Sequence, residues 1–218
     1  MKLLLTSSGN TNKSIENALL DILGKPFAEA RLVFIPTAAN VEEDISGWLE
    51  NDINNFRKLE LKSLEVIDIS KVEKETWLPI FEKADILVFG GGNEEYLLNC
   101  IREVGLESLL QEFIKTKIYV GISAGSMITA KMLSLNDSGA LYYEKFDRKG
   151  EHEGLGYVNF EVRPHLNSPH FPQVRIDILQ EIASKIGHTF YAIDDNTTLK
   201  IVDKTIEVVS EGKWKKFN

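Results

Sequence analysis

The sequence predicts a single α/β domain spanning residues 1–218, with a mostly parallel central sheet flanked by helices. Apolar runs alternate with segments of helical periodicity along most of the chain. Two runs, Arg31–Pro36 and Asp85–Gly90, have continuously apolar centres, which is typical of strands covered on both faces. No internal repeat, charge block or flexible linker divides the 218 residues, so one domain is the simplest arrangement.

The individual elements follow from the spacing of apolar residues and from turn signals. The expected strands are Leu3–Ser7, Arg31–Pro36, Leu64–Ile69, Asp85–Gly90, Lys117–Gly121 and Tyr157–Val162. The expected helices are Ser14–Leu23 with Ser14 or Asn12 near its cap, Val41–Leu61, Val72–Lys83, a helix after Asn93 through Cys100, Glu107–Thr116, Met127–Met132 and Phe171–Ile186. Pro79 is expected to weaken the second half of its helix. Short strands are expected between Thr189 and Phe217, and a polar, turn-rich loop over Leu133–Glu153.

Composition and charge limit the classes of function. The formal net charge of −8 disfavours nucleic acid and anionic membranes as partners, because both attract basic surfaces. The one cysteine, Cys100, cannot form an internal disulfide, which favours a cytoplasmic protein in a reducing compartment. The apolar run Leu3–Leu5 is too short for a signal peptide. No apolar run approaches the ~20 residues of a membrane span.

Residues 121–125, GISAG, match the G-x-S-x-G pattern of a nucleophile elbow. In such an elbow a serine projects from a sharp strand-to-helix turn, where only small neighbours fit. A strand is expected before Ser123 and a helix after it, as the elbow requires. The backbone N–H of Ala124 would point toward a developing oxyanion. The alternative is a glycine-rich turn in which Ser123 serves only as a small capping residue, and the context favours the nucleophile.

A serine nucleophile needs a general base, and His165 is the preferred candidate among the four histidines. It follows a proline just after an expected strand, where a rigid turn can present the imidazole to an elbow. His170 is the rival. His152 lies in an acidic stretch typical of a solvated loop, and His188 follows a glycine at an expected helix end. No metal or cofactor is expected, because the spacing of His165 and His170 is not helical and no metal-binding pattern accompanies them.

Two aspartates are candidates for the acid that orients the base. Asp137 lies shortly after the elbow, and Asp195 lies in a turn after a late strand. Both chain orders are compatible with a triad, since triads are recognised by the roles of their members. An aspartate beside asparagine is also a common turn former, which is the alternative for each.

The glycine cluster Gly90–Gly92, followed by Asn93, lies at the end of an expected strand, where open α/β sheets bind ligands. Its bare N–H groups could complete an oxyanion hole with Ala124. A phosphate or dinucleotide cradle is a weaker interpretation, because neither phosphate-binding glycine pattern is present. A tight turn without a catalytic role is a further alternative.

Five motifs occur in a characteristic order: LLLTSSGN, FIPTAAN, FGGGNEEYLL, GISAGSMITA and RPHLNSPHF. With them the chain resembles the serine dipeptidase E family, whose members include aspartyl dipeptidase and, more distantly, cyanophycinase. The resemblance covers most of the chain, with residues 133–156 poorly matched. It implies a fold similar to class I glutamine amidotransferases, flavodoxin-like in its layering, with a serine in place of their cysteine.

The resemblance also implies roles for individual residues. Ser123 would be the nucleophile and His165 its base, and Gly91 or Gly92 would supply the second oxyanion donor. Asp137 is slightly favoured as the acid, and Asp195 stays open. The substrate-side residues are expected to be Asn93, His170 and Arg175.

The expected substrate is a short peptide cleaved through an acyl-enzyme, with Asp-X dipeptides as one possibility. An N-terminal aspartate would need a cationic partner, for which Arg163 and Arg175 are candidates, although a lone arginine is more commonly a surface charge. A carboxylester hydrolase and a non-catalytic metabolite-binding module on the same scaffold are the alternative functions.

Overall fold

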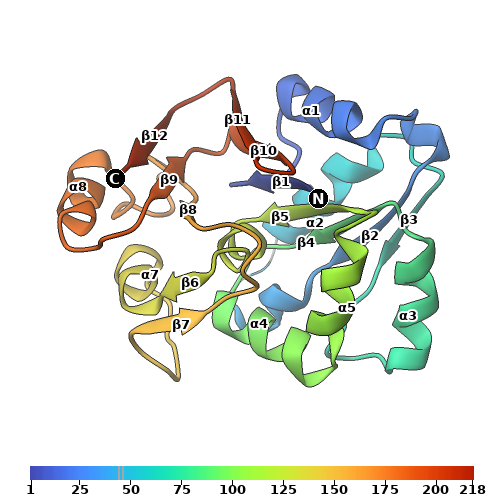
Figure 1. Ribbon diagram of the computed structural model, residues 1–218, viewed down its shortest axis with the longest axis horizontal. Coiled ribbons are helices and arrows are strands. Elements are labelled where there is room, and N and C mark those ends of the chain that lie inside the picture. Colours follow the sequence, from blue (N-terminus) through green and yellow to red (C-terminus); the bar gives the residue numbers. More distant parts are fainter. Residues whose placement is uncertain (44, 46) are drawn as a thin grey trace.

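A computed structural model describes residues 1–43, 45 and 47–218, and its centre is a seven-stranded sheet (Figure 1). The strand order is β11-β10-β1-β5-β4-β2-β3. Strands β1 to β5 run parallel to one another. Strands β10 and β11 form an antiparallel pair at one edge, and β10 is also antiparallel to β1. The bounds are β1 Lys2–Thr6, β2 Arg31–Ile35, β3 Ser63–Val66, β4 Ile86–Phe89, β5 Ile118–Ile122, β10 Thr197–Val202 and β11 Thr205–Ser210.

Helices cover both faces of this sheet, as the apolar strands predict (Figure 1). One face packs against α1 and α2, and the other packs against α3, α4 and α5. Alternation within β1 shows the arrangement, because Leu3 and Leu5 belong to one core and Leu4 belongs to the other. The bounds are α1 Lys13–Leu23, α2 Trp48–Arg57, α3 Lys74–Lys83, α4 Glu94–Glu103 and α5 Leu106–Phe113. The predicted α/β class with a mostly parallel sheet is confirmed.

A smaller region continues the chain beyond β5. The four-residue helix α6 (Ala124–Met127) leads into the hairpin of β6 (Met132–Ser134) and β7 (Glu151–Glu153), which encloses α7 (Leu135–Tyr142). A three-stranded sheet, β12-β9-β8, packs against α8 around a third core. Its elements are β8 Glu161–Arg163, α8 Ile176–Ala183, β9 Phe190–Ile193 and β12 Trp214–Phe217. The loop expected over Leu133–Glu153 therefore contains a helix and two short strands.

Several predicted helices differ in extent from the observed ones. The segment Val41–Leu61 forms only α2, preceded by a 3-10 helix at Thr37–Val41, and its residues 44 and 46 lie outside the described residues. The helix expected at Met127–Met132 is wrong, because α6 begins directly after Ser123 and β6 begins at Met132. In contrast, α3 continues past Pro79 to Lys83, since Trp77 and Phe81 are buried in the core on its inner face. A further 3-10 turn, Phe27–Glu29, precedes β2.

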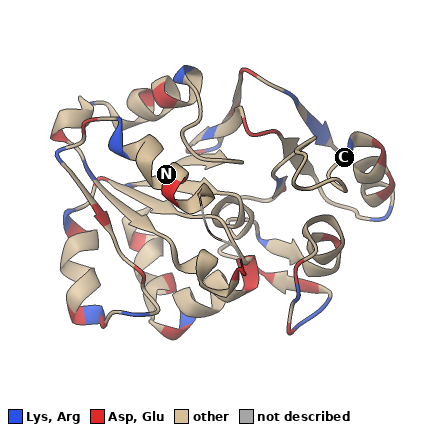
Figure 2. Cartoon of the chain, turned by 180° about the vertical axis from the view of Figure 1, so that it is seen from behind, with Lys and Arg blue, Asp and Glu red and all other residues tan. Residues whose placement is uncertain are grey.

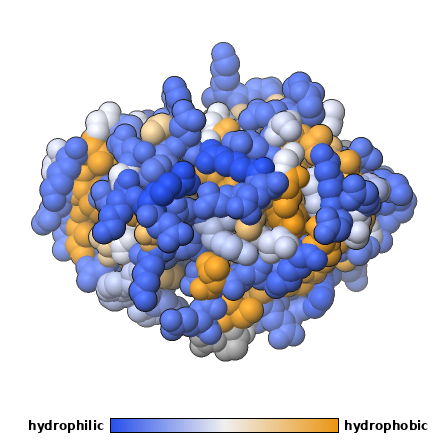
Figure 3. Space-filling view, turned by 90° about the horizontal axis from the view of Figure 1, so that it is seen from below, coloured by the Kyte–Doolittle hydropathy of each residue, from blue (hydrophilic) through white to orange (hydrophobic). Residues whose placement is uncertain are grey.

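The surface carries charges of both signs. Lys and Arg are dispersed among many elements in Figure 2, interspersed with Asp and Glu. The face in Figure 3 is mostly hydrophilic, with hydrophobic residues visible in separate patches. Within the described ranges, no helix is both long enough and apolar enough to cross a membrane.

Candidate active site

Ser123 lies in the sharp turn between β5 and α6, as the elbow pattern predicts. Its backbone has φ 47° and ψ −112°, a conformation that non-glycine residues rarely adopt. The flanking glycines make the turn possible. A Cβ on Gly121 would lie 2.6 Å from the carbonyl oxygen of Gly125, and a Cβ on Gly125 would lie 2.0 Å from that of Phe89. The pattern therefore reflects close backbone packing around the serine.

The predicted oxyanion donors surround this turn. Ala124 is the first residue of α6, and Gly91 and Gly92 line the same cavity as Ser123. A Cβ on Gly91 would lie 3.3 Å from the Ser123 Cβ, so the glycine loop passes directly beside the serine. Among the described residues, no acceptor takes a backbone hydrogen bond from Gly91, Gly92 or Ala124. These N–H groups are thus available to a ligand.

His165 contacts Ser123, with 3.0 Å between His165 Nε2 and Ser123 Oγ. It lies in the loop between β8 and α8, in a left-handed backbone conformation with φ 62°. Its ring stacks on Phe171 with 4.6 Å between the ring centroids, and its backbone N–H donates to Ser7 Oγ at 2.8 Å. These contacts hold the imidazole in place, and only 13% of the His165 side chain is exposed.

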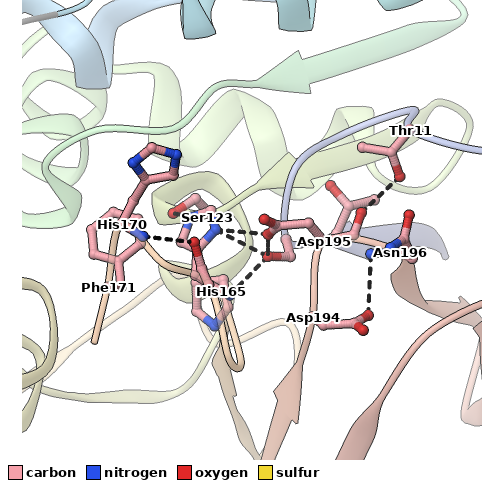
Figure 4. Close-up of polar contacts among 12 residues, drawn as sticks. Thr11, Ser123, His165, His170, Phe171, Asp194, Asp195 and Asn196 are labelled. Carbon is pink, nitrogen blue, oxygen red and sulfur yellow. Dashed lines mark hydrogen bonds and ion pairs between the residues drawn. The ribbon is translucent and has the colours of Figure 1, made fainter. Parts of the chain in front are cut away.

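Asp195 lies on the other side of the imidazole, at 2.8 Å between Oδ1 and His165 Nδ1 (Figure 4). Asp195 lies in the turn between β9 and β10, beside the end of β1. Ser7 Oγ donates to the same carboxylate oxygen at 2.5 Å. Burial of this carboxylate raises its pKa, but hydrogen bonds from His165, Ser7 and Ser8 outweigh that effect and lower the pKa to about 2. Asp195 is therefore ionised at neutral pH.

The structure does not bring the other aspartate, Asp137, to the imidazole. Asp137 lies in the first turn of α7, where its charge acts on the buried guanidinium of Arg163. The slight preference for Asp137 is therefore corrected in favour of Asp195 as the contact of His165. Sequence spacing could not distinguish the two, because the contact of Asp195 with His165 depends on how distant segments pair, including β10 with β1.

Two of the expected substrate-side residues have structural contacts instead. The Asn93 side chain caps α4 by accepting from the backbone N–H of Tyr96 at 2.8 Å, and it is not part of the cavity lining. Arg175 donates to the carbonyl oxygens of Phe171, Val174 and Ser168, which fixes the loop that carries His165. His170 does line the cavity.

Arg163, the other candidate partner for a substrate aspartate, is only 1% exposed. It pairs with Glu161 and donates to Ser138 Oγ at 2.9 Å. His188 contacts the same glutamate from the other side, at 2.7 Å between Nε2 and Oε1. Arg163 therefore supports the smaller region and does not line the cavity.

The cavity above Ser123 has a volume of about 650 Å³, which is within the range of small-molecule sites. Sequence reasoning missed several of its polar residues: Ser7, Glu42, Asp52 and Glu144. Ser7 could have been found from its place directly after the buried strand β1. The three carboxylates carry no motif, and only the tertiary fold brings them together. No group of three or more His, Cys, Asp or Glu suited to a metal ion occurs in the part of the chain that the structure describes.

A strained serine at the end of a parallel strand, hydrogen-bonded to a buried imidazole, defines the class of serine-type hydrolases. Residues 3–209 match the family model described as Peptidase family S51. The chain belongs to this peptidase family, and it is a serine-type peptidase.

Individual relatives agree with this assignment. An uncharacterised peptidase of Listeria monocytogenes is 28% identical over 182 residues, covering 80% of this chain and 83% of the relative. Peptidase E of a Nostoc species is 22% identical over 213 residues, covering 82% and 85% of the two chains.

Solved structures share the fold. A crystal structure from Listeria monocytogenes EGD-e superposes with a TM-score of 0.77 at 24% identity, covering 97% of this chain and 98% of that one. A peptidase from an acI-B1 actinobacterium gives a TM-score of 0.73 at 20% identity, covering 98% and 88%.

Proposed function

We propose that this peptidase hydrolyses short peptides, as a dipeptidase-like enzyme, through a Ser123–His165–Asp195 triad and an acyl-enzyme intermediate. The observation that carries the proposal is the continuous chain of contacts from Ser123 Oγ through both ring nitrogens of His165 to Asp195 Oδ1. The cavity volume of about 650 Å³ supports a small substrate.

Each residue has one task in the proposed reaction. Asp195 accepts the Nδ1–H of His165, which leaves Nε2 unprotonated and facing the serine. His165 takes the Ser123 proton as Oγ attacks the peptide carbonyl, and the carbonyl oxygen becomes an oxyanion. The N–H groups of Ala124 and of Gly91 or Gly92 stabilise that charge, at ~3 kcal/mol for one donor.

The same groups complete the cycle. His165 gives its proton to the leaving amine, and the C–N bond breaks to form an ester with Ser123. Water then attacks this ester, with His165 accepting the water proton, and the released serine recovers its own proton.

The test is labelling with a fluorophosphonate, followed by mapping of the modified residue, together with dipeptide hydrolysis by Ser123→Ala. We expect label on Ser123 alone and a loss of at least ~10³-fold in kcat for the variant, with an unchanged circular dichroism spectrum. Ser108→Ala is the matched control, since this exposed serine lies on α5, outside the cavity. Full dipeptidase activity in Ser123→Ala would refute the proposal, and activity confined to short acyl esters would instead support a carboxylester hydrolase.

A further inference from the structure

The cavity that contains Ser123 is strongly acidic. Glu42, Asp52 and Glu144 line it, in addition to Asp195, and its described lining includes no Lys or Arg. Glu42 and Asp52 lie on either side of the start of α2, whereas Glu144 follows α7. Two segments that are far apart in the chain therefore direct carboxyl groups into one cavity, beside the nucleophile.

None of these three carboxyl groups forms an ion pair with a described residue, although twelve ion pairs occur elsewhere in the described ranges. The Oε2 atom of Glu144 is buried and has no hydrogen-bond partner among the described residues. An ionised carboxylate in such surroundings is costly unless a cation or donor compensates for it. The cavity thus places carboxyl groups beside the nucleophile without a described cation to neutralise them.

Electrostatics support the same conclusion. Burial raises the pKa of Asp52 to about 7, with a further contribution from the charge of Asp195. Burial also raises the pKa of Glu144 to about 9, and the charges of Glu94 and Glu42 add to this, against one backbone N–H of Glu94 that lowers it. Each of these groups must hold a proton or face a cation, and a substrate cation can take the place of the proton.

An anionic substrate side chain finds no Lys or Arg in the described lining, where the basic side chains are those of His165 and His170. Arg163 pairs with Glu161, and Arg175 donates to backbone carbonyl oxygens, so both arginines that could bind an aspartate have protein partners, and neither is among the described lining residues. An aspartate in the cavity would lie among four carboxyl groups, one of which, Asp195, is ionised at neutral pH, and its charge would oppose ionisation of the other three. Like charges brought together in a poorly solvated site repel strongly.

From these contacts we infer that the cavity selects substrates whose N-terminal residue carries a basic side chain, lysine or arginine, with Glu144 and Asp52 as the specificity-determining acids. The inference rests on the proposed peptidase function of Ser123. Every free peptide already carries an α-ammonium group, so the additional discrimination comes from the charge of the side chain.

The test compares dipeptides that share leucine as the second residue. Lysyl-leucine, norleucyl-leucine and aspartyl-leucine differ in side-chain charge, and norleucine is close to lysine in shape. We expect kcat/KM of the wild-type protein to be about tenfold or more higher for lysyl-leucine than for norleucyl-leucine, and lowest for aspartyl-leucine. Equal values for the lysyl and norleucyl substrates, or the highest value for aspartyl-leucine, would overturn the inference.

Variants identify the acids responsible. Glu144→Gln and Asp52→Asn should each reduce the ratio of lysyl to norleucyl kcat/KM by about tenfold, chiefly through KM for the lysyl substrate. Glu50→Gln is the matched control, because Glu50 is exposed on α2 and does not line the cavity. The ratio is measured within one variant, so a partial loss of folded protein cancels. An unchanged ratio in both cavity variants would refute their role.

A binding measurement separates this inference from the proposed function. Calorimetry with Ser123→Ala should show tighter binding of lysyl-leucine than of norleucyl-leucine, without any turnover. If the wild-type protein cleaves no dipeptide but this preference is present, the proposed function fails and the assignment of a pocket for basic side chains stands. If dipeptides are cleaved and the preference is absent, the pocket assignment fails and the peptidase proposal stands.

Discussion

At the scale of single residues, the backbone conformation of Ser123 is energetically unfavourable. A non-glycine residue at φ 47° and ψ −112° stores on the order of 1–3 kcal/mol of strain. Backbone hydrogen bonds hold it there, since the Ser123 N–H donates to Thr6 and its carbonyl accepts from Ser126 and Met127. In this conformation Ser123 Oγ lies 3.0 Å from His165 Nε2.

The two aspartate candidates can be separated by matched substitutions. Asp195→Asn should lower kcat by about 10²–10⁴-fold, because the amide can no longer fix the imidazole tautomer that leaves Nε2 free. Asp137→Asn should change kcat by less than about threefold, since the charge of Asp137 acts on Arg163 and Asp137 does not contact His165. Steady-state hydrolysis at constant pH measures both. The reverse order of effects would return the acid role to Asp137.

At the scale of elements, the contact between β5, α6 and β4 depends on glycine. Gly125→Ala would place a Cβ 2.0 Å from the Phe89 carbonyl oxygen, and backbone atoms cannot withdraw cheaply. We expect this variant to lose at least ~2–3 kcal/mol in the free energy of unfolding, or to fail to accumulate in folded form. Urea denaturation followed by circular dichroism measures the change.

Gly187→Ala is the control for this substitution. A Cβ on Gly187 would meet nothing within 4 Å, so the free energy of unfolding should stay within about 0.5 kcal/mol of wild type. A Gly125→Ala variant as stable as this control would show that the turn tolerates a side chain.

Local signals predicted the elements well and their lengths less well. Strands β1 to β5 and helix α1, with Asn12 as its cap, follow from apolar runs and a capping side chain, whereas β6 and β7 fall at the ends of a predicted loop. The helix expected from Phe171 begins only at Ile176, because Phe171 packs on the His165 ring and the carbonyl oxygens of Phe171 and Val174 accept from Arg175. Periodicity cannot reveal such a tertiary use of a helix-compatible segment.

At the scale of the whole molecule, some residues of the candidate site could be predicted from the sequence and others could not. Ser123 and His165 could be predicted because each lies in a local motif. The choice of Asp195, the support from Ser7 and the acidic lining from Asp52 and Glu144 depend on contacts between distant segments, which a single sequence does not show.

The buried acids should also shape the pH dependence of stability. Since the pKa of Asp52 is about 7 in the folded protein and about 3.9 in an unfolded chain, the folded state holds an extra proton between these values. The free energy of unfolding should therefore fall as pH rises from 4 to 7, by up to ~1.4 kcal/mol per pH unit for this one proton. Asp52→Asn should flatten the slope, as measured by urea denaturation across this range.

Two comparisons check the assignment of that slope. Glu50→Gln should leave it unchanged, because Glu50 is exposed on the same helix. Asp195→Asn should remove a contribution of opposite sign at lower pH, since the lowered pKa of Asp195 stabilises the fold above about pH 4, and that stabilisation is lost as pH falls toward 2. Between pH 4 and 7 this variant should only lessen the slope, because the Asp195 charge adds to the rise in the Asp52 pKa. A slope in Asp52→Asn equal to that of wild type would contradict the assignment.

The position of β10 beside β1 has a consequence for the protein during its synthesis. Asp195 lies just before β10, and β10 pairs with β1, a strand that is synthesised long before it. A nascent chain released at residue 190 would contain the serine and the imidazole without the carboxylate. Under the proposed triad, such a truncated product would lack the carboxylate that orients His165.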